Sequence, residues 1–325
     1  MGTIDVIGRC SWTLGVALCA ANVFAQSYPT KPIRMVITYP PGGNADLVGR
    51  AMAGKLSELM GQSVVVDNRG GAGGILGTMI TAQAAPDGYT IMLGTSAGMM
   101  LNPLLSSKLP YDALKDFAPV SKVIVLPQLL VTNPQLSAKT MKELIALAKA
   151  KPGTLNAGSS GVGTPNHLGT ELLKSLAGVN IVHVPYKGGG QAITDLMGGQ
   201  IQMAFSSVPA VLPHIRAGRL NALGVGSARR SPALPNVPTI AESGVPGYEY
   251  TAWNGIFAPA RTPQAILTRL NAEIIKGLAT PEIHQRFVAN GGDPASSTPD
   301  ELRAYMLDES ARWAKIIKVV GIRIE

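Results

Sequence analysis

The chain has 325 residues, of which 46% are hydrophobic and 15% are charged, a composition typical of a folded globular protein and unlike that of a disordered one. The net charge of +8 is compatible with an anionic ligand. Long runs of Lys and Arg are absent and aromatic residues make up only 5%, which argues against nucleic acid as a partner.

Residues 1–25 are predicted to form a cleavable signal peptide. Arg9 precedes the apolar stretch WTLGVALCAANVFA, which is too short to cross a bilayer, and Val23 and Ala25 suit cleavage before Gln26. Both cysteines of the chain lie in this segment, so we expect a mature protein without a disulfide or a cysteine metal site. The predicted destination is an extracytoplasmic compartment.

Between residues 33 and 98 the sequence repeats a short apolar strand, a glycine-rich junction and an amphipathic helix. The strand IRMVIT leads through YPPGGNAD into a helix that stops at Gly61 and carries one apolar stripe, formed by Val48, Met52, Leu56 and Leu59. SVVVDN then leads into RGGAGG and a further helix, and YTIML leads into GTSAG. This order predicts a βαβαβ unit with parallel strands, because such crossovers are right-handed.

A second unit of the same kind begins near QLLVTN. Its first helix is predicted to start with a capping box formed by Thr140 and Glu143. Three pairs of strand and loop follow: TLNA with GSSGVGTPNHLG, VNIVHVP with YKGGG, and IQMAF with SSVP. Each strand again ends in a small-residue loop that begins a helix.

The proline-rich stretch from Ser227 to Tyr248 is predicted to be an irregular connector. After it, TAWNGIFAPA predicts a strand, and three helices are expected. The last of them opens with the capping box TPDE and has Pro299 at its first helical position. Because these helices have no strand-rich unit of their own to cover, we expect them to return to the first unit.

The predicted architecture is therefore an α/β fold of two lobes. Residues 26–127 and 249–325 form lobe 1, which is discontinuous in sequence, and residues 128–248 form lobe 2. The two hinge segments that cross between the lobes lie near Pro127 and near Tyr248.

The glycine-rich loops predict a binding cleft. In an open parallel sheet, ligands bind at the carboxyl ends of the strands, where these loops lie. A helix start presents free backbone N–H groups and a partial positive charge, which favour an anion, and Asn44 and Thr164 are candidates to cap their helices there. Turn formation alone would also account for the glycines of any single loop. Several such loops in both lobes favour a shared carboxylate site.

Two motifs resemble enzyme signatures. GTSAG matches the nucleophile-elbow pattern and would make Ser96 the nucleophile of a secreted serine hydrolase, but no oxyanion motif of the HGGG type precedes it. The run GGAGGILG lacks the glycine spacing of a dinucleotide fingerprint, and no P-loop pattern occurs. The hydrolase stays an alternative, and no cofactor is predicted.

The histidines are scattered along the chain, and no pattern such as H-x-x-x-H occurs, so no metal site is predicted. His167 lies in the first turn of a helix, where it suits a ligand or a neighbouring backbone group equally. His183 lies inside a strand and is interpreted as structural. Lys187 in YKGGG either pairs with an acidic ligand or is solvated.

Motifs along essentially the whole mature chain carry a family resemblance. They are YPTKPIRMVITYPPGGNAD, GQSVVVDNRGGAGG, APDGYTIMLGTSA, LPYD with KDFAPV, KELIALAKAKPG, GSSGVGTPNHL, LAGVNIVHVPYKGGGQAITDLMGGQI, VPTIAESGVPGYE and WNGIFAPARTP. In this order they closely resemble the tripartite tricarboxylate transporter substrate-binding family, also called the Bug family. The resemblance implies a type II periplasmic binding protein without catalysis, each lobe a mostly parallel sheet flanked by helices.

The resemblance further implies a ligand and a partner. The ligand would be a small organic carboxylate, either a di- or tricarboxylate, an acidic amino acid or an aromatic acid, and the partner would be the subunits of a membrane permease. The loops PPGGNAD, GTSA and SSGVGT would bind a carboxylate through backbone amides, small hydroxyls and water, while Asp46 suits a capping role better. With Lys187 and Ser206 added, the candidate ligand-binding residues are Pro41, Gly42, Gly43, Asn44, Asp46, Thr95, Ser96, Ser159, Ser160, Gly163, Thr164, His167, Lys187 and Ser206.

One departure from the family pattern bears on specificity. After IQMAF the family commonly carries Asp followed by Asn or Ser, whereas Ser206 and Ser207 stand here, which removes a charge near the far end of the ligand. We therefore expect a weaker preference for ligands with a distal amino group. The sequence leaves open which carboxylate binds, and whether the protein serves a permease or acts as a sensor for a signalling partner.

Overall fold

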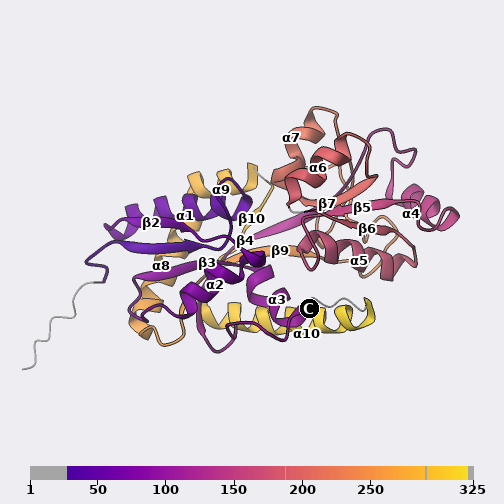
Figure 1. The fold of residues 1–325 in the computed structure, drawn as a ribbon. Helices are drawn as coiled ribbons and strands as arrows, with labels where there is room; N and C mark the ends of the chain where they lie inside the picture. Colours follow the sequence, from indigo (N-terminus) through magenta and orange to yellow (C-terminus); the bar gives the residue numbers. More distant parts are fainter. Residues whose placement is uncertain (1–27, 187, 290, 321–325) are drawn as a thin grey trace, which may run out of the picture.

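The computed structural model describes residues 28–186, 188–289 and 291–320. The predicted signal peptide over 1–25 and Lys187 therefore lie outside the described residues. The described part consists of two α/β lobes joined by the long strand β4 (Phe117–Thr132), which takes part in the sheets of both (Figure 1). None of its helices combines the length and the apolarity that crossing a bilayer requires.

Lobe 1 contains the predicted βαβαβ unit. Strand β1 pairs in parallel with β2 on one side and with β3 on the other, which confirms the predicted topology. Val48, Met52 and Leu56 are buried against this sheet, and the helix that carries them ends at Gly61, whose φ of 67° is readily adopted by glycine. The elements are β1 (Ile33–Ile37), α1 (Asn44–Met60), β2 (Val64–Asn68), η1 (Ala72–Gly74), α2 (Ile75–Ala82), β3 (Thr90–Thr95), η2 (Ala97–Leu101) and α3 (Asn102–Leu105).

Lobe 2 is built around strand β5, which pairs in parallel with β6 and β7. The predicted capping box is present, because the Thr140 side chain accepts from the Glu143 N–H and the Glu143 side chain accepts from the Thr140 N–H. Residues 227–248 form turns and irregular backbone, as predicted for the connector. The elements are α4 (Met141–Ala150), β5 (Asn156–Ser159), α5 (Pro165–Ala177), β6 (Val182–Pro185), α6 (Gly189–Met197), β7 (Met203–Ser207), α7 (Val208–Arg216) and β8 (Asn221–Val225).

The two chain crossings lie side by side. Along β4, residues up to Pro127 pair with β9 (Thr251–Pro259), and residues from Gln128 onward pair with β7 and β8. Gly226 joins the crossings, because its N–H donates to the Gln128 carbonyl at 2.6 Å and its carbonyl accepts from the Tyr250 N–H at 2.7 Å. The exact lobe boundaries stay a prediction, and this change of partners along β4 supports them.

The three predicted C-terminal helices are present and differ in what they cover. Helices α8 (Gln264–Leu278) and α9 (Pro281–Ala289) contact α1 in lobe 1, and α9 contacts the short strand β10 (Asp293–Pro294). Helix α10 (Pro299–Val320) starts with the predicted capping box.

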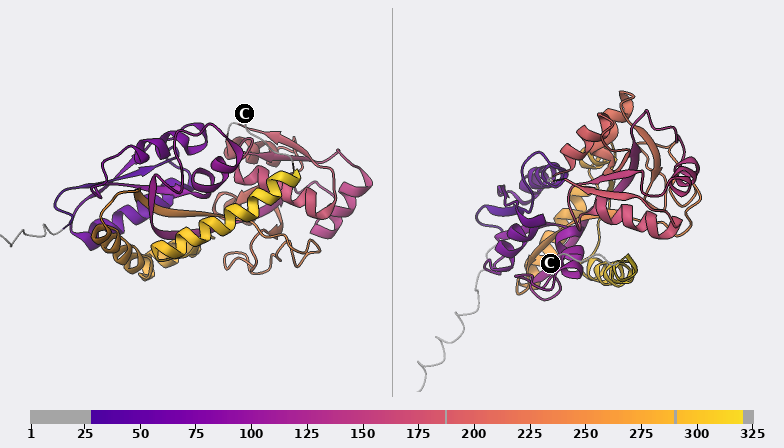
Figure 2. Two further views of the ribbon diagram at one scale, coloured as in Figure 1. Left: turned by 90° about the horizontal axis from the view of Figure 1, so that it is seen from below. Right: turned by 45° about the vertical axis from the view of Figure 1, so that its right-hand side comes forward.

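Helix α10 extends across both lobes rather than covering lobe 1 alone. Leu302 and Met306 in its first half join a cluster with β3 and β9 of lobe 1. Figure 2 shows α10, drawn in yellow, running along both lobes. Trp313 and Ile317 in its second half join the core of lobe 2, where Trp313 contacts the Tyr250 ring and α10 contacts α5. Its apolar stripe therefore has a different partner in each half.

Candidate functional site

A cavity of about 760 Å³ lies between the lobes. It sits beyond the carboxyl ends of β1, β2, β3 and β5, where an open α/β sheet is expected to bind its ligand. Lobe 2 contributes the loop before α5, and lobe 1 contributes the rest. The described lining residues are Tyr39, Ala72, Gly73, Ile75, Ala97, Asn102, Ser106, Ser107, Lys108, Val162, Gly163 and Thr164.

The loop SSGVGT before α5 is held by its own side chains. The Ser159 hydroxyl donates to the Gly161 carbonyl at 3.0 Å and accepts from the Gly161 N–H at 3.1 Å. The Ser160 hydroxyl donates to Asn166 Oδ1 at 2.9 Å. Thr164 occupies the N-cap position of α5, but its hydroxyl donates to the Gly161 carbonyl instead of accepting from the helix. The first turn of α5 therefore receives no side-chain cap from Thr164.

His167 supports this loop from beneath. Its Nδ1 accepts from the Gly163 N–H at 3.0 Å, so the ring carries its proton on Nε2, which faces the Glu171 carboxylate at 3.7 Å. His183 stacks on it with ring centroids 3.7 Å apart, and its Nε2 lies 2.6 Å from the Ser159 hydroxyl. These contacts support the interpretation of His183 as structural. His167 bonds to the loop backbone through the Gly163 N–H.

Both imidazoles are neutral at neutral pH. Burial and, to a smaller extent, the nearby Lys174 ammonium together lower the pKa of His167 to about 4. Burial also lowers the pKa of His183 to about 4, assisted by the charge that its partner His167 would carry. Stacking at this distance favours two uncharged rings.

Asp46 anchors the opening loop from the first turn of α1. It accepts from the Gly42 N–H, from Arg50 Nε and from Asn68 Nδ2, each at 2.9 Å. Burial by itself would raise the pKa of Asp46, but these three hydrogen bonds and the Arg50 charge outweigh it and hold the pKa below its usual value. The bond from Gly42 lies before the N-cap Gly43, where no side-chain cap forms, so the predicted capping role of Asp46 stays a prediction.

The rest of the PPGGNAD loop lies on the surface. Pro41, Gly42 and Gly43 are exposed, and Gly43 is the N-cap of α1. The prediction that Asn44 caps this helix is wrong, because Asn44 is already its first helical residue. Asn44 lines a separate crevice of about 30 Å³ together with Pro209.

The GTSA loop is buried. Thr95 Oγ1 accepts from the Gly98 N–H at 3.2 Å, which holds the turn after β3. Ser96 is only 1% exposed, and its hydroxyl accepts from the Trp253 N–H at 3.4 Å. Ala97, the next residue, lines the cavity.

A family model whose description is "Tripartite tricarboxylate transporter family receptor" matches residues 48–322. The chain belongs to this family. Protein BugT of Bordetella pertussis (strain Tohama I) is 41% identical to this receptor over 99% of this chain and 98% of BugT.

Three solved structures resemble the receptor over nearly its whole described length. "R. palustris Rpa4515 with adipate" is 36% identical, with a TM-score of 0.85 over 91% of this chain and 99% of that one. "MatC (Rpa3494) from Rhodopseudomonas palustris with bound malate" is 30% identical, with a TM-score of 0.79 over 89% of this chain and 100% of that one. "Structure of periplasmic binding protein BugD" is 32% identical, with a TM-score of 0.82 over 92% of this chain and 100% of that one. The predicted family and the predicted periplasmic-binding-protein fold are both confirmed.

The structure brings some candidate residues of the receptor to the cavity and leaves others away from its lining. Gly163 and Thr164 line it directly. Ser206 is 7% exposed and lies on β7, opposite Leu129 of β4. Ser159, Thr95 and the opening loop lie behind or beside the lining residues, so their role as ligand contacts stays a prediction.

Sequence reasoning missed several lining residues of the receptor. Tyr39 and Asn102 both donate to the Gly73 carbonyl, each at 3.2 Å, and so fix the loop after β2. Tyr39 directly precedes the PPGG motif and could have been found there. Asn102 and Lys108 follow η2 in a stretch without a glycine-rich signal, and only the fold brings them to the cavity.

Proposed function

We propose that this receptor binds a small organic carboxylate in the cavity between its lobes, in the periplasm, and delivers it to the permease subunits of a tripartite tricarboxylate-type transporter. Its relatives support this ligand class, because one is named with adipate and another with bound malate. The family description supports the partner.

The observation that carries the proposal is the chemistry of the cavity wall. Among the described lining residues none is acidic, while hydroxyl, amide and ammonium groups all contribute. The wall also includes the loop that leads into α5, a helix of thirteen residues. The start of such a helix carries a partial positive charge, and the N–H groups of its first turn after Pro165 have no partner within the helix. Such a wall stabilises a carboxylate and offers no charged partner to a cationic ligand.

We propose binding without catalysis. A hydrolase that uses Ser96 would need that hydroxyl to reach a substrate, yet Ser96 is 1% exposed and its hydroxyl contacts the Trp253 backbone. A sensor that docks a signalling partner would use the same cavity, and a test for copurification with the permease subunits separates the two roles.

A thermal-shift screen of the chain from Gln26 tests the ligand class. The compounds are mono-, di- and tricarboxylates, acidic amino acids, aromatic acids and neutral sugars. A ligand at about 100 times its Kd adds about 2.7 kcal/mol of stability and raises Tm by several degrees. Selective stabilisation by a carboxylate supports the proposal, whereas stabilisation only by a neutral or cationic compound would overturn it.

A further inference from the structure

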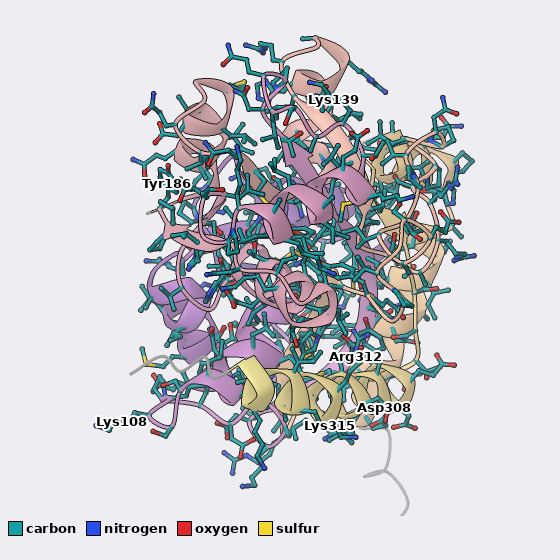
Figure 3. The ribbon with its side chains drawn as sticks, turned by 90° about the vertical axis from the view of Figure 1, so that its right-hand side faces the viewer. Lys108, Lys139, Tyr186, Asp308, Arg312 and Lys315 are labelled. Carbon is teal, nitrogen blue, oxygen red and sulfur yellow. The ribbon has the colours of Figure 1, made fainter. Side chains whose placement is uncertain are left out.

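A basic side chain takes part in the cavity wall. Lys108 is the one basic residue among the described lining residues, and it lies on the loop that follows α3 (Figure 3). The Lys108 N–H donates to the Ser106 hydroxyl at 3.3 Å, which shapes the turn, and the residue is exposed. The inference drawn from it rests on the proposed carboxylate ligand.

Lys108 differs from the arginines near the neighbouring loops. Arg50 pairs with Asp46 and Arg69 pairs with Asp67, each with nitrogen and oxygen 2.9 Å apart. Both guanidinium groups therefore already contact an internal carboxylate, which Arg69 shares with Arg34. Within the described ranges, Lys108 forms no ion pair with a carboxylate of the protein. An ammonium group at a cavity wall without an internal counter-ion is suited to a negative group of the ligand.

The cavity also has room and surface for a spacer. Its volume of about 760 Å³ falls within the range of about 300–1,000 Å³ that is typical of small-molecule sites. Ala72, Ile75, Ala97 and Val162 add aliphatic surface to the wall. The wall therefore matches a ligand with an apolar middle better than one that is polar throughout.

We propose that Lys108 is the specificity-determining residue that selects a dicarboxylate with an apolar spacer. One carboxylate binds at the positive end of α5 in lobe 2, and the other pairs with Lys108 in lobe 1. Such a ligand contacts both lobes at once, so it binds more tightly than a monocarboxylate, which reaches only one of them.

The test compares acids that differ only in the second carboxylate. Isothermal titration calorimetry measures Kd for succinate, adipate and suberate, and for butanoate, hexanoate and octanoate, with the wild type and with Lys108→Gln. Loss of a charged hydrogen bond weakens dicarboxylate binding about tenfold. The same variant should change monocarboxylate binding by less than about twofold, because these acids have no second carboxylate to pair with Lys108.

Two further variants serve as controls. Lys108→Arg keeps the charge and restores most of the dicarboxylate affinity. Lys315→Gln removes the same charge from the exposed face of α10, away from the cavity lining, and leaves both acid series unchanged (Figure 3). Because Lys108 and Lys315 are both exposed, the ligand-free variants should unfold at the wild-type Tm.

The outcomes separate this inference from the proposed function. If neither acid series bound the wild type while neutral compounds did, the carboxylate proposal itself would fail, and the role of Lys108 with it. If dicarboxylates bound the wild type and Lys108→Gln equally, or if both series weakened alike, the ligand class would stand and the selective role of Lys108 would be wrong. If the wild type bound monocarboxylates and no dicarboxylate, the ligand class would again stand and the selective role of Lys108 would be wrong.

Discussion

Val162 offers a direct test of the charge preference of the cavity. It lines the cavity, is 49% exposed and lies on the loop before α5, so a substitution there leaves the core intact. Val162→Asp adds a carboxylate beside the proposed anion. At about 6 Å, two like charges repel by about 0.7 kcal/mol in water and about 3 kcal/mol at an effective dielectric of about 20. The expected loss of carboxylate affinity is therefore about 3-fold to 100-fold.

The matched control is Val162→Asn, which has nearly the same shape as the Asp variant and no charge. Calorimetry with the acid that gives the largest thermal shift would measure Kd for both variants at low and at high salt. We expect the difference between Asp and Asn to shrink in high salt, because salt screens the repulsion. Equal affinities of the two variants at low salt would refute an anionic ligand beside this loop.

Three further predictions concern stability. In the folded protein the pKa values of His167 and His183 are about 4, below their usual value of 6.5. The unfolded chain therefore binds more protons between these values, and the free energy of unfolding should be highest above pH 6.5 and fall by a few kcal/mol as the pH drops toward about 4. NMR signals of these imidazoles that titrate near pH 6.5 would contradict this. Gly226→Ala would put a Cβ 2.7 Å from the Tyr250 carbonyl oxygen, and we expect it to lower the free energy of unfolding, measured in urea, by about 1–3 kcal/mol. The control Gly54→Ala adds a Cβ that meets nothing within 4 Å, so it should be neutral or stabilising. Trp313→Ala should cost about 3–5 kcal/mol, and a calorimetric Tm equal to that of the wild type would argue against its role in joining the lobes.

Local patterns determined much of the fold before any coordinates. Hydrophobic periodicity located the strands and helices of the βαβαβ unit, and the capping boxes at Thr140 and Thr298 marked two helix starts, because these signals arise from residues within one turn of each other. The order of the motifs also sufficed for the family. Glycine-rich loops at strand ends pointed to a cleft, since strand ends meet at one edge of a sheet.

The tertiary structure alone decided which side chains surround that cleft. Lys108 and Asn102 reach it from a stretch without a sequence signal, while His167 turns its Nδ1 to the Gly163 N–H instead of toward a ligand. Likewise, the capping box predicted where α10 begins, and the helix was expected on lobe 1, but no local signal indicated that Trp313 would pack on lobe 2. Periodicity reports which face of an element is buried, whereas the identity of its partner depends on contacts between residues far apart in the chain.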